Sequence, residues 1–186
     1  MNIWKEPYPN DLQALLRDTN KLSKLIVEKL QVAPRIKDLY TESGANGKLY
    51  RSREIFDLLN TEPNVKYNGS KAMNEIKGIY VLGKKMNGVI TPDYVGISDT
   101  ILRRIKQHGW GTGHNQSSLA YLMAKYNTGY TGSRENLDQE VLKKYQKQVQ
   151  QHYIVVHSVT EAYDKYFMEV ALAGILNTKW NSFKTH

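Results

Sequence analysis

The chain contains no cysteine, and this absence excludes several kinds of chemistry at once. Disulfides, thiolate zinc sites and cysteine nucleophiles all need a sulfur atom that this sequence does not supply. No uncharged apolar stretch approaches the roughly 18–20 residues of a membrane helix. Lys5, Glu6 and Asp11 stand where a signal peptide would need an apolar run. We therefore expect an intracellular, cytoplasmic protein with no membrane-spanning segment.

Common motifs for nucleotide binding and hydrolysis are missing as well. The sequence contains no GxxxxGK[ST] loop, no GxSxG elbow and no HExxH helix. The glycines at 109, 111 and 113 lack the preceding strand and the spacing of a phosphate-binding loop, so they predict a flexible turn. The five histidines are scattered, and no pair has metal-ligand spacing.

Positive charge is what the sequence has in excess. Lys and Arg number 26 against 18 Asp and Glu, and residues 71–127 carry five of the eight excess charges. A basic excess gathered on one segment favours a polyanionic partner, nucleic acid first among them. The alternative is a basic face that only contacts solvent, and charge alone does not decide between them. The 13 tyrosines can likewise stack on bases or fill a core.

The first 70 residues predict a helical N-terminal arm. Leucines and isoleucines recur at helical spacing after a cap at Asn10 or Asp11, until Pro34 ends the pattern. A second, short helix is expected from a cap at Ser52 to Leu59. The loop at 68–70 is the predicted boundary between this arm, 1–70, and a core, 71–186.

The core alternates between strand and helix patterns, which predicts an α+β fold. Residues 78–82 and 93–97 are β-branched and aromatic and flank a turn-forming Asn-Gly pair, so they predict a hairpin. The polar segment 128–150 is expected to carry a largely solvated helix at 143–148. The remaining expected elements are a helix capped by Ser98 or Asp99, a helix from Ser117, a strand at 152–157 and a helix capped by Thr160.

An ordered set of polar residues runs through this core. Gly78-Ile79-Tyr80 is followed by Tyr94-Val95-Gly96, and Arg104 and His108 then share one face of the next helix. Glu169 and Asn181 complete the set in the last helix and just beyond it. With its order and spacing, the set resembles the GIY-YIG nuclease superfamily over residues 78–181. Val95 replaces the family's isoleucine, and the segment between His108 and Glu169 is longer than usual, which places an insertion near 128–150.

The resemblance implies a small three-stranded antiparallel sheet flanked by helices and an enzyme that hydrolyses DNA phosphodiesters with one divalent cation, Mg²⁺ or Mn²⁺. Glu169 would hold the metal, and Arg104 would bind a phosphoryl oxygen. Tyr80 would act as the general base, with its pKa lowered by Arg104, His108 and the metal, and Tyr94 would position water or phosphate. His108 would hold Tyr80 or the phosphate, and Asn181 would tie the C-terminal segment to the site.

Compact restriction and phage-type endonucleases are the members that the chain resembles most, because we expect no DNA-binding module after the core. We expect basic side chains to contact the DNA backbone: Lys84, Lys85, Arg103, Lys106, Lys143, Lys144 and Lys147. A double-strand cut would require two active sites, hence a homodimer or a transient tetramer. The alternative is a catalytically silent nucleic-acid-binding protein on the same fold.

Overall fold

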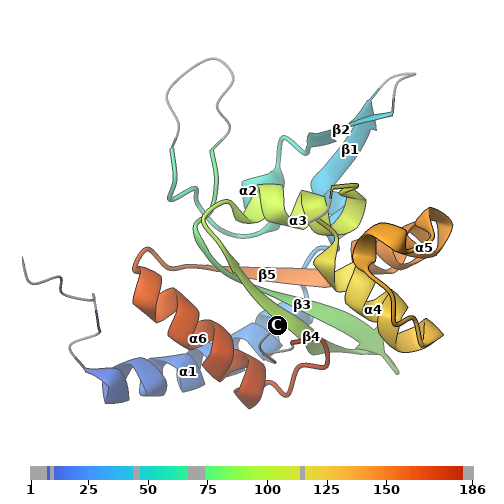
Figure 1. The fold of residues 1–186 in the computed structure, drawn as a ribbon. Coiled ribbons are helices and arrows are strands. Elements are labelled where there is room, and N and C mark those ends of the chain that lie inside the picture. The colour runs from blue at the N-terminus through green and yellow to red at the C-terminus, as the bar shows by residue number, and fades with distance from the viewer. Residues whose placement is uncertain (1–7, 9–10, 44–46, 67–73, 114–115, 182–186) are drawn as a thin grey trace, which may run out of the picture.

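The structure is a computed structural model that describes residues 8, 11–43, 47–66, 74–113 and 116–181 (Figure 1). In these residues the chain has an α+β fold, as predicted, and none of the helices is both long and apolar enough to cross a membrane. The helices are α1 (Leu12–Leu30), η1 (Ile36–Leu39), α2 (Ile55–Leu58), α3 (Ile101–Trp110), α4 (Ser118–Thr128), η2 (Arg134–Asn136), α5 (Gln139–Gln150) and α6 (Ala162–Ile175), of which η1 and η2 are 3₁₀-helices. The strands are β1 (Tyr40–Ser43), β2 (Lys48–Arg51), β3 (Gly78–Met86), β4 (Val89–Ser98) and β5 (Tyr153–Ser158).

Three antiparallel strands form the larger sheet, in the order β4-β3-β5. Asn87 and Gly88 both have positive φ, 50° and 87°, as a tight hairpin turn between β3 and β4 requires. This confirms the predicted hairpin and the predicted three-stranded antiparallel sheet. A second, two-stranded sheet of β1 and β2 was not expected, because neither strand has the length or the apolar alternation of a strand in a core.

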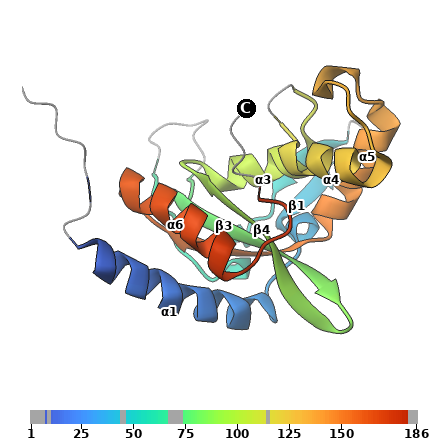
Figure 2. The same ribbon diagram turned by 60° about the horizontal axis from the view of Figure 1, so that its bottom comes forward.

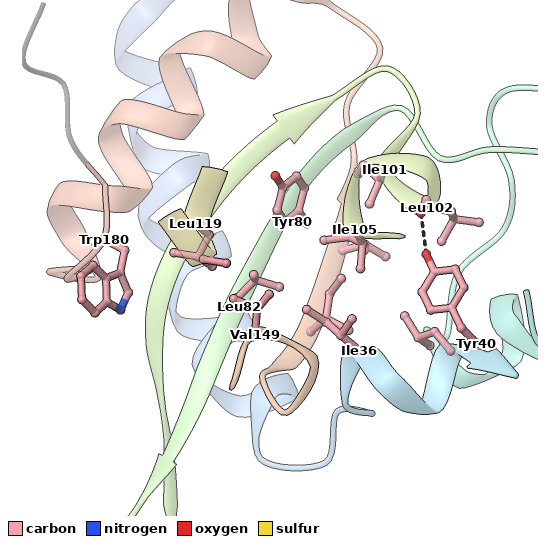
Figure 3. Close-up of a cluster of buried hydrophobic side chains, with 14 of the residues drawn as sticks. Ile36, Tyr40, Tyr80, Leu82, Ile101, Leu102, Ile105, Leu119, Val149 and Trp180 are labelled. Atoms are coloured by element: carbon pink, nitrogen blue, oxygen red, sulfur yellow. Dashed lines mark hydrogen bonds between the residues drawn. The ribbon is translucent and has the colours of Figure 1, made fainter. Parts of the chain in front are cut away.

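Helices cover both faces of the three-stranded sheet (Figures 1 and 2). Ile79 and Val81 of β3 pack with α1 and α6, whereas Tyr80 and Leu82 pack with α3, α4 and α5. Figure 3 shows Tyr80 and Leu82 among the buried side chains on the α3, α4 and α5 side of the sheet, with Ile105 of α3 close by. Successive side chains of a strand point to opposite faces, so this alternation divides the core into two layers.

The N-terminal segment contributes to both layers. Leu22, Ile26 and Leu30 of α1 are buried against one face of the sheet, and Ile36 and Leu39 of η1 are buried in the cluster on the other. Asp11 caps α1, with its carboxylate accepting a hydrogen bond from the Ala14 N–H at 2.8 Å, as predicted. The boundary expected at 68–70 lies outside the described residues, so the division of the chain at residue 70 stays a prediction.

Other predicted caps are wrong by one or two residues. The N-cap positions of α2, α3 and α6 are Glu54, Thr100 and Glu161, and none of their side chains makes a capping hydrogen bond. Ser52 and Ser98 instead accept hydrogen bonds from backbone N–H groups two residues later, at Glu54 and Thr100. These serines stabilise the turn before the helix rather than its first turn.

A distant carboxylate caps α3. Glu75 is buried and accepts hydrogen bonds from the backbone N–H groups of Leu102 and Arg103, at 3.0 and 3.2 Å. The same carboxylate pairs with the guanidinium of Arg51 on β2. A residue 27 positions earlier in the chain therefore satisfies the first turn of α3, which local sequence patterns cannot reveal.

Helix α5 is not the largely solvated helix that its lysines predict. Leu142, Tyr145, Gln146 and Val149 are buried in the cluster formed with α3 and α4. Their spacing is that of one helical face, but the lysines and glutamines between them hide it. Residues 128–150 are therefore packed on the domain, with only the lysine-bearing side of α5 facing solvent.

Candidate active site

The two tyrosines of the triplets lie on neighbouring strands. Tyr80 of β3 pairs with Gly96 of β4, and the ring centroids of Tyr80 and Tyr94 are 6.1 Å apart. A Cβ atom on Gly96 would lie 2.4 Å from the Cζ and Oη atoms of Tyr80, far inside van der Waals contact. Glycine at position 96 therefore leaves the space that the Tyr80 ring occupies.

His108 of α3 is fully buried against both tyrosines. The Tyr80 hydroxyl and His108 Nε2 are 2.8 Å apart, and the Tyr94 and His108 ring centroids are 5.8 Å apart. Burial, with the positive charges of Arg104 and Arg134, lowers the pKa of His108 to about 3. His108 is therefore neutral near pH 7 and holds a single ring proton. With that proton on Nδ1, Nε2 accepts the hydrogen bond from Tyr80, and the buried Nδ1 has no partner in the described residues.

Arg104 lies one helical turn before His108 on α3 and reaches the start of α4. Its Nη2 donates to Ser118 Oγ at 2.9 Å, and its Nη1 is 3.4 Å from Gln107 Oε1. Burial raises the pKa of both Tyr80 and Tyr94, and the charge of the guanidinium opposes this rise. A forked donor of this kind can bind two oxygens of one phosphate.

Burial nevertheless outweighs Arg104 at both tyrosines. Desolvation is the largest cause at each ring, and it raises the pKa of Tyr80 well above 10 and that of Tyr94 above its usual value. Arg104 and His108 by themselves therefore do not bring the pKa of Tyr80 below its usual value, and the part expected from the metal stays a prediction. His108 is also neutral, so it supplies no positive charge to the phenol.

Glu169 of α6 approaches the same site from the other layer. It is half-buried, and its negative charge raises the pKa of Tyr94. Burial raises the pKa of Glu169 itself above its usual value, although Lys165 opposes this shift. Within the described residues, the Glu169 carboxylate makes no hydrogen bond or ion pair. It is free to bind a cation.

Among the described residues, Glu169 is the carboxylate whose charge acts on Tyr94. The described part of the chain has no group of three or more His, Cys, Asp and Glu side chains that could hold an ion. A one-carboxylate site suits Mg²⁺, which keeps several waters and takes its other ligands from a substrate phosphate. The donor set at Glu169 therefore fits a magnesium ion bound together with a phosphate, and not a closed protein cage.

Asn181 joins the C-terminal segment to the outer edge of β4. Its Oδ1 accepts from the Val95 N–H and its Nδ2 donates to the Val95 carbonyl, both at 2.8 Å. Trp180 donates its backbone N–H to the Asp93 carbonyl and its indole N–H to the Asp93 carboxylate. These bonds satisfy edge groups of β4 on either side of Tyr94 and fix the backbone that carries it.

The basic residues expected to contact DNA are distributed over β3, α3 and α5. Lys84 and Lys85 line a pocket of about 460 Å³ with Arg35, at the beginning of β5. Lys106 donates to the Leu49 carbonyl at 2.8 Å, so its ammonium is held by β2. The others are exposed: Arg103, Lys143, Lys144 and Lys147, of which Lys143 pairs with Glu140 and Lys144 lies over the Tyr145 ring.

Arg134 is the residue near this site that the sequence interpretation missed. It lies on η2, inside the segment treated as an insertion; its charge helps to lower the pKa of His108, and its own pKa is lowered by burial and by the charge of Arg104. No local motif marks it, and only the packing of the 128–150 segment against α3 and α4 brings it here.

Comparisons of the chain with protein-family models, with curated proteins and with solved structures give no match.

Proposed function

We propose that this protein is a divalent-metal-dependent DNA endonuclease of the restriction or phage type, resembling the GIY-YIG nucleases. One observation carries the proposal: Tyr80, Tyr94, Arg104 and His108 come together from β3, β4 and α3, and the charge of Glu169 on α6 acts on Tyr94. Strand aromatics or surface charges without a common role would have no reason to converge in this way. The basic excess of residues 71–127 suits a polyanionic substrate.

The residue types match what phosphodiester hydrolysis needs. Water attacks phosphorus, the bond to the 3′ oxygen breaks, and the water proton must pass to a base. Arg104 would bind the non-bridging oxygens and neutralise the charge that develops on them. Glu169 would hold Mg²⁺ or Mn²⁺, which supplies Lewis-acid stabilisation to the phosphoryl and leaving oxygens.

The geometry favours a proton relay over a free tyrosinate. Because the pKa of Tyr80 is raised, its phenol is protonated when the substrate arrives. Tyr80 could take a proton from water while giving its own to His108 Nε2, 2.8 Å away. A bound phosphodiester would bring negative charge beside Arg104 and His108 and raise the pKa of His108 from about 3, which makes it a better acceptor.

A plasmid-cleavage assay with Mg²⁺ or Mn²⁺ tests the proposal. Wild type should convert supercoiled DNA to nicked or linear forms, and EDTA should abolish this. Tyr80→Phe removes the relay and should slow cleavage on the order of 10²–10⁴-fold. Glu169→Gln should lose nearly all activity, whereas Glu161→Gln, an exposed glutamate just before the same helix, should cut like wild type.

Each failure has its own meaning. If wild type binds DNA but cuts none of the tested substrates, the chain is a silent nucleic-acid-binding protein, which is the alternative function. Cleavage that survives Glu169→Gln would refute the metal assignment alone. Discrete fragments would indicate sequence specificity, whereas a smear would indicate nonspecific cutting.

A further inference from the structure

Arg134 lies on the same side of α4 as Arg104. Arg104 donates to Ser118 in the first turn of α4, and Tyr121 follows three residues later on the same helical face. The Arg134 guanidinium lies over the Tyr121 ring, with its Cζ atom 5.8 Å from the ring centroid. Two guanidinium groups therefore flank the beginning of one helix, from two different segments of the chain.

The loop that carries Arg134 is held in place. Tyr121 donates its hydroxyl proton to the Gly132 carbonyl at 3.0 Å, and Tyr130 donates to the Ser133 carbonyl at 2.8 Å. A Cβ atom on Gly132 would lie 2.4 Å from the Tyr130 hydroxyl oxygen. Glycine at position 132 thus allows the loop to pack closely on Tyr130, and this packed turn holds Arg134 in place.

The Arg134 guanidinium is a partly buried positive charge close to that of Arg104. In the described residues, the guanidinium of Arg134 has no hydrogen bond and no ion pair, and its one ring contact is with Tyr121. Burial lowers the pKa of Arg134, and the charge of Arg104 lowers it further. Bringing two like charges together in a partly desolvated site costs free energy that a bound anion would recover.

A pocket opens beside Arg134. Its volume is about 230 Å³, well above the roughly 30 Å³ that one water occupies in the liquid. The loop that follows α3, the helix of Arg104 and His108, forms one wall. The lining residues are Thr112, Gly113, Arg134, Glu135, Gln139 and Leu142.

We propose that Arg134 binds a second phosphate of the DNA backbone, next to the phosphate held by Arg104, and that this pocket receives it. The inference rests on the proposed function and extends it: the 128–150 segment is part of the substrate-binding surface. A guanidinium held over an aromatic ring suits this role, because the contact with the ring does not use its N–H donors. Glu135 also lines the pocket, and its negative charge would repel the phosphate and keep it on the Arg134 side.

Binding to an uncleavable substrate tests the inference. Affinity for a duplex oligonucleotide is measured as a function of salt in the full chain carrying Glu169→Gln, with and without Arg134→Ala. Each phosphate contact contributes a slope of about −0.9 in log K against log salt. Loss of one contact should therefore make the slope shallower by about 0.9. Between 1 M and 0.1 M salt, the affinity of Arg134→Ala should then increase about eightfold less than that of the parent chain. Arg17→Ala removes an equal charge from the exposed face of α1 and should change neither quantity.

Two further measurements keep the outcomes separate. Arg134→Lys keeps the charge but not the fork, so it should retain the salt slope while weakening binding; it also serves if Arg134→Ala unfolds. In cleavage by the otherwise wild-type chain, Arg134→Ala should raise KM more than it lowers kcat. An unchanged salt slope for a folded Arg134→Ala overturns the inference. Absence of any cleavage by wild type, with the slope change present, overturns the proposed function and leaves the phosphate site standing.

Discussion

Replacing Gly96 with alanine should displace Tyr80. The new Cβ would meet the Tyr80 ring at 2.4 Å, whereas carbon atoms in contact lie about 3.5–4.0 Å apart. The ring must therefore move by more than ~1 Å. The Tyr80 ring is only 1% exposed, so we expect a cost of about 1–3 kcal/mol in the free energy of unfolding. A movement of this size would also break the 2.8 Å contact with His108.

Thermal unfolding and NMR of the His108 ring measure the two effects. For a chain of this length, each kcal/mol lowers Tm by about 2–4 °C. Cleavage should fall on the order of 10²-fold, because a 1 Å misplacement of a reacting group costs about that much. Gly174→Ala is the matched control: its Cβ would meet nothing within 4 Å on α6, and we expect up to about 1 kcal/mol of stabilisation with unchanged activity. Wild-type stability and an unchanged His108 spectrum in Gly96→Ala would refute the close packing of Tyr80 on Gly96.

Two further predictions concern buried charge. Glu75→Gln should destabilise the protein by about 2–4 kcal/mol in chemical unfolding, because Arg51 and the first turn of α3 lose a shared carboxylate. As a control, Glu62→Gln at an exposed position should stay within about 0.5 kcal/mol of wild type. An equally small effect of Glu75→Gln would contradict the capping of α3 by Glu75. The pKa of His108 is about 3 in the folded chain against 6.5 in the unfolded chain. As pH falls below 6.5, His108 is protonated in the unfolded state but not in the folded state, so the free energy of unfolding decreases. At pH 5 this loss is about 2 kcal/mol, and His108→Gln should lack it; identical pH dependence in the two proteins would show that His108 is not buried as described.

Local patterns were sufficient for some elements and not for others. The β3–β4 hairpin and α1 follow from strand-forming residues, an Asn-Gly turn and an Asp cap, all of which act between near neighbours in sequence. The cap of α3 was missed because Glu75 reaches it from a distant segment. The buried face of α5 was missed because one of the residues on that face, Gln146, is polar and interrupts the apolar pattern.

The sequence by itself determined the α+β class, the hairpin and the order in which the candidate site residues appear. These depend on backbone preferences and on apolar periodicity, which a linear chain displays. Only the tertiary structure decided which of these residues meet, that Arg134 joins them and that burial raises the pKa of Tyr80 despite Arg104. Proximity and desolvation depend on what surrounds a side chain, and here those surroundings come from segments more than twenty residues apart in the sequence.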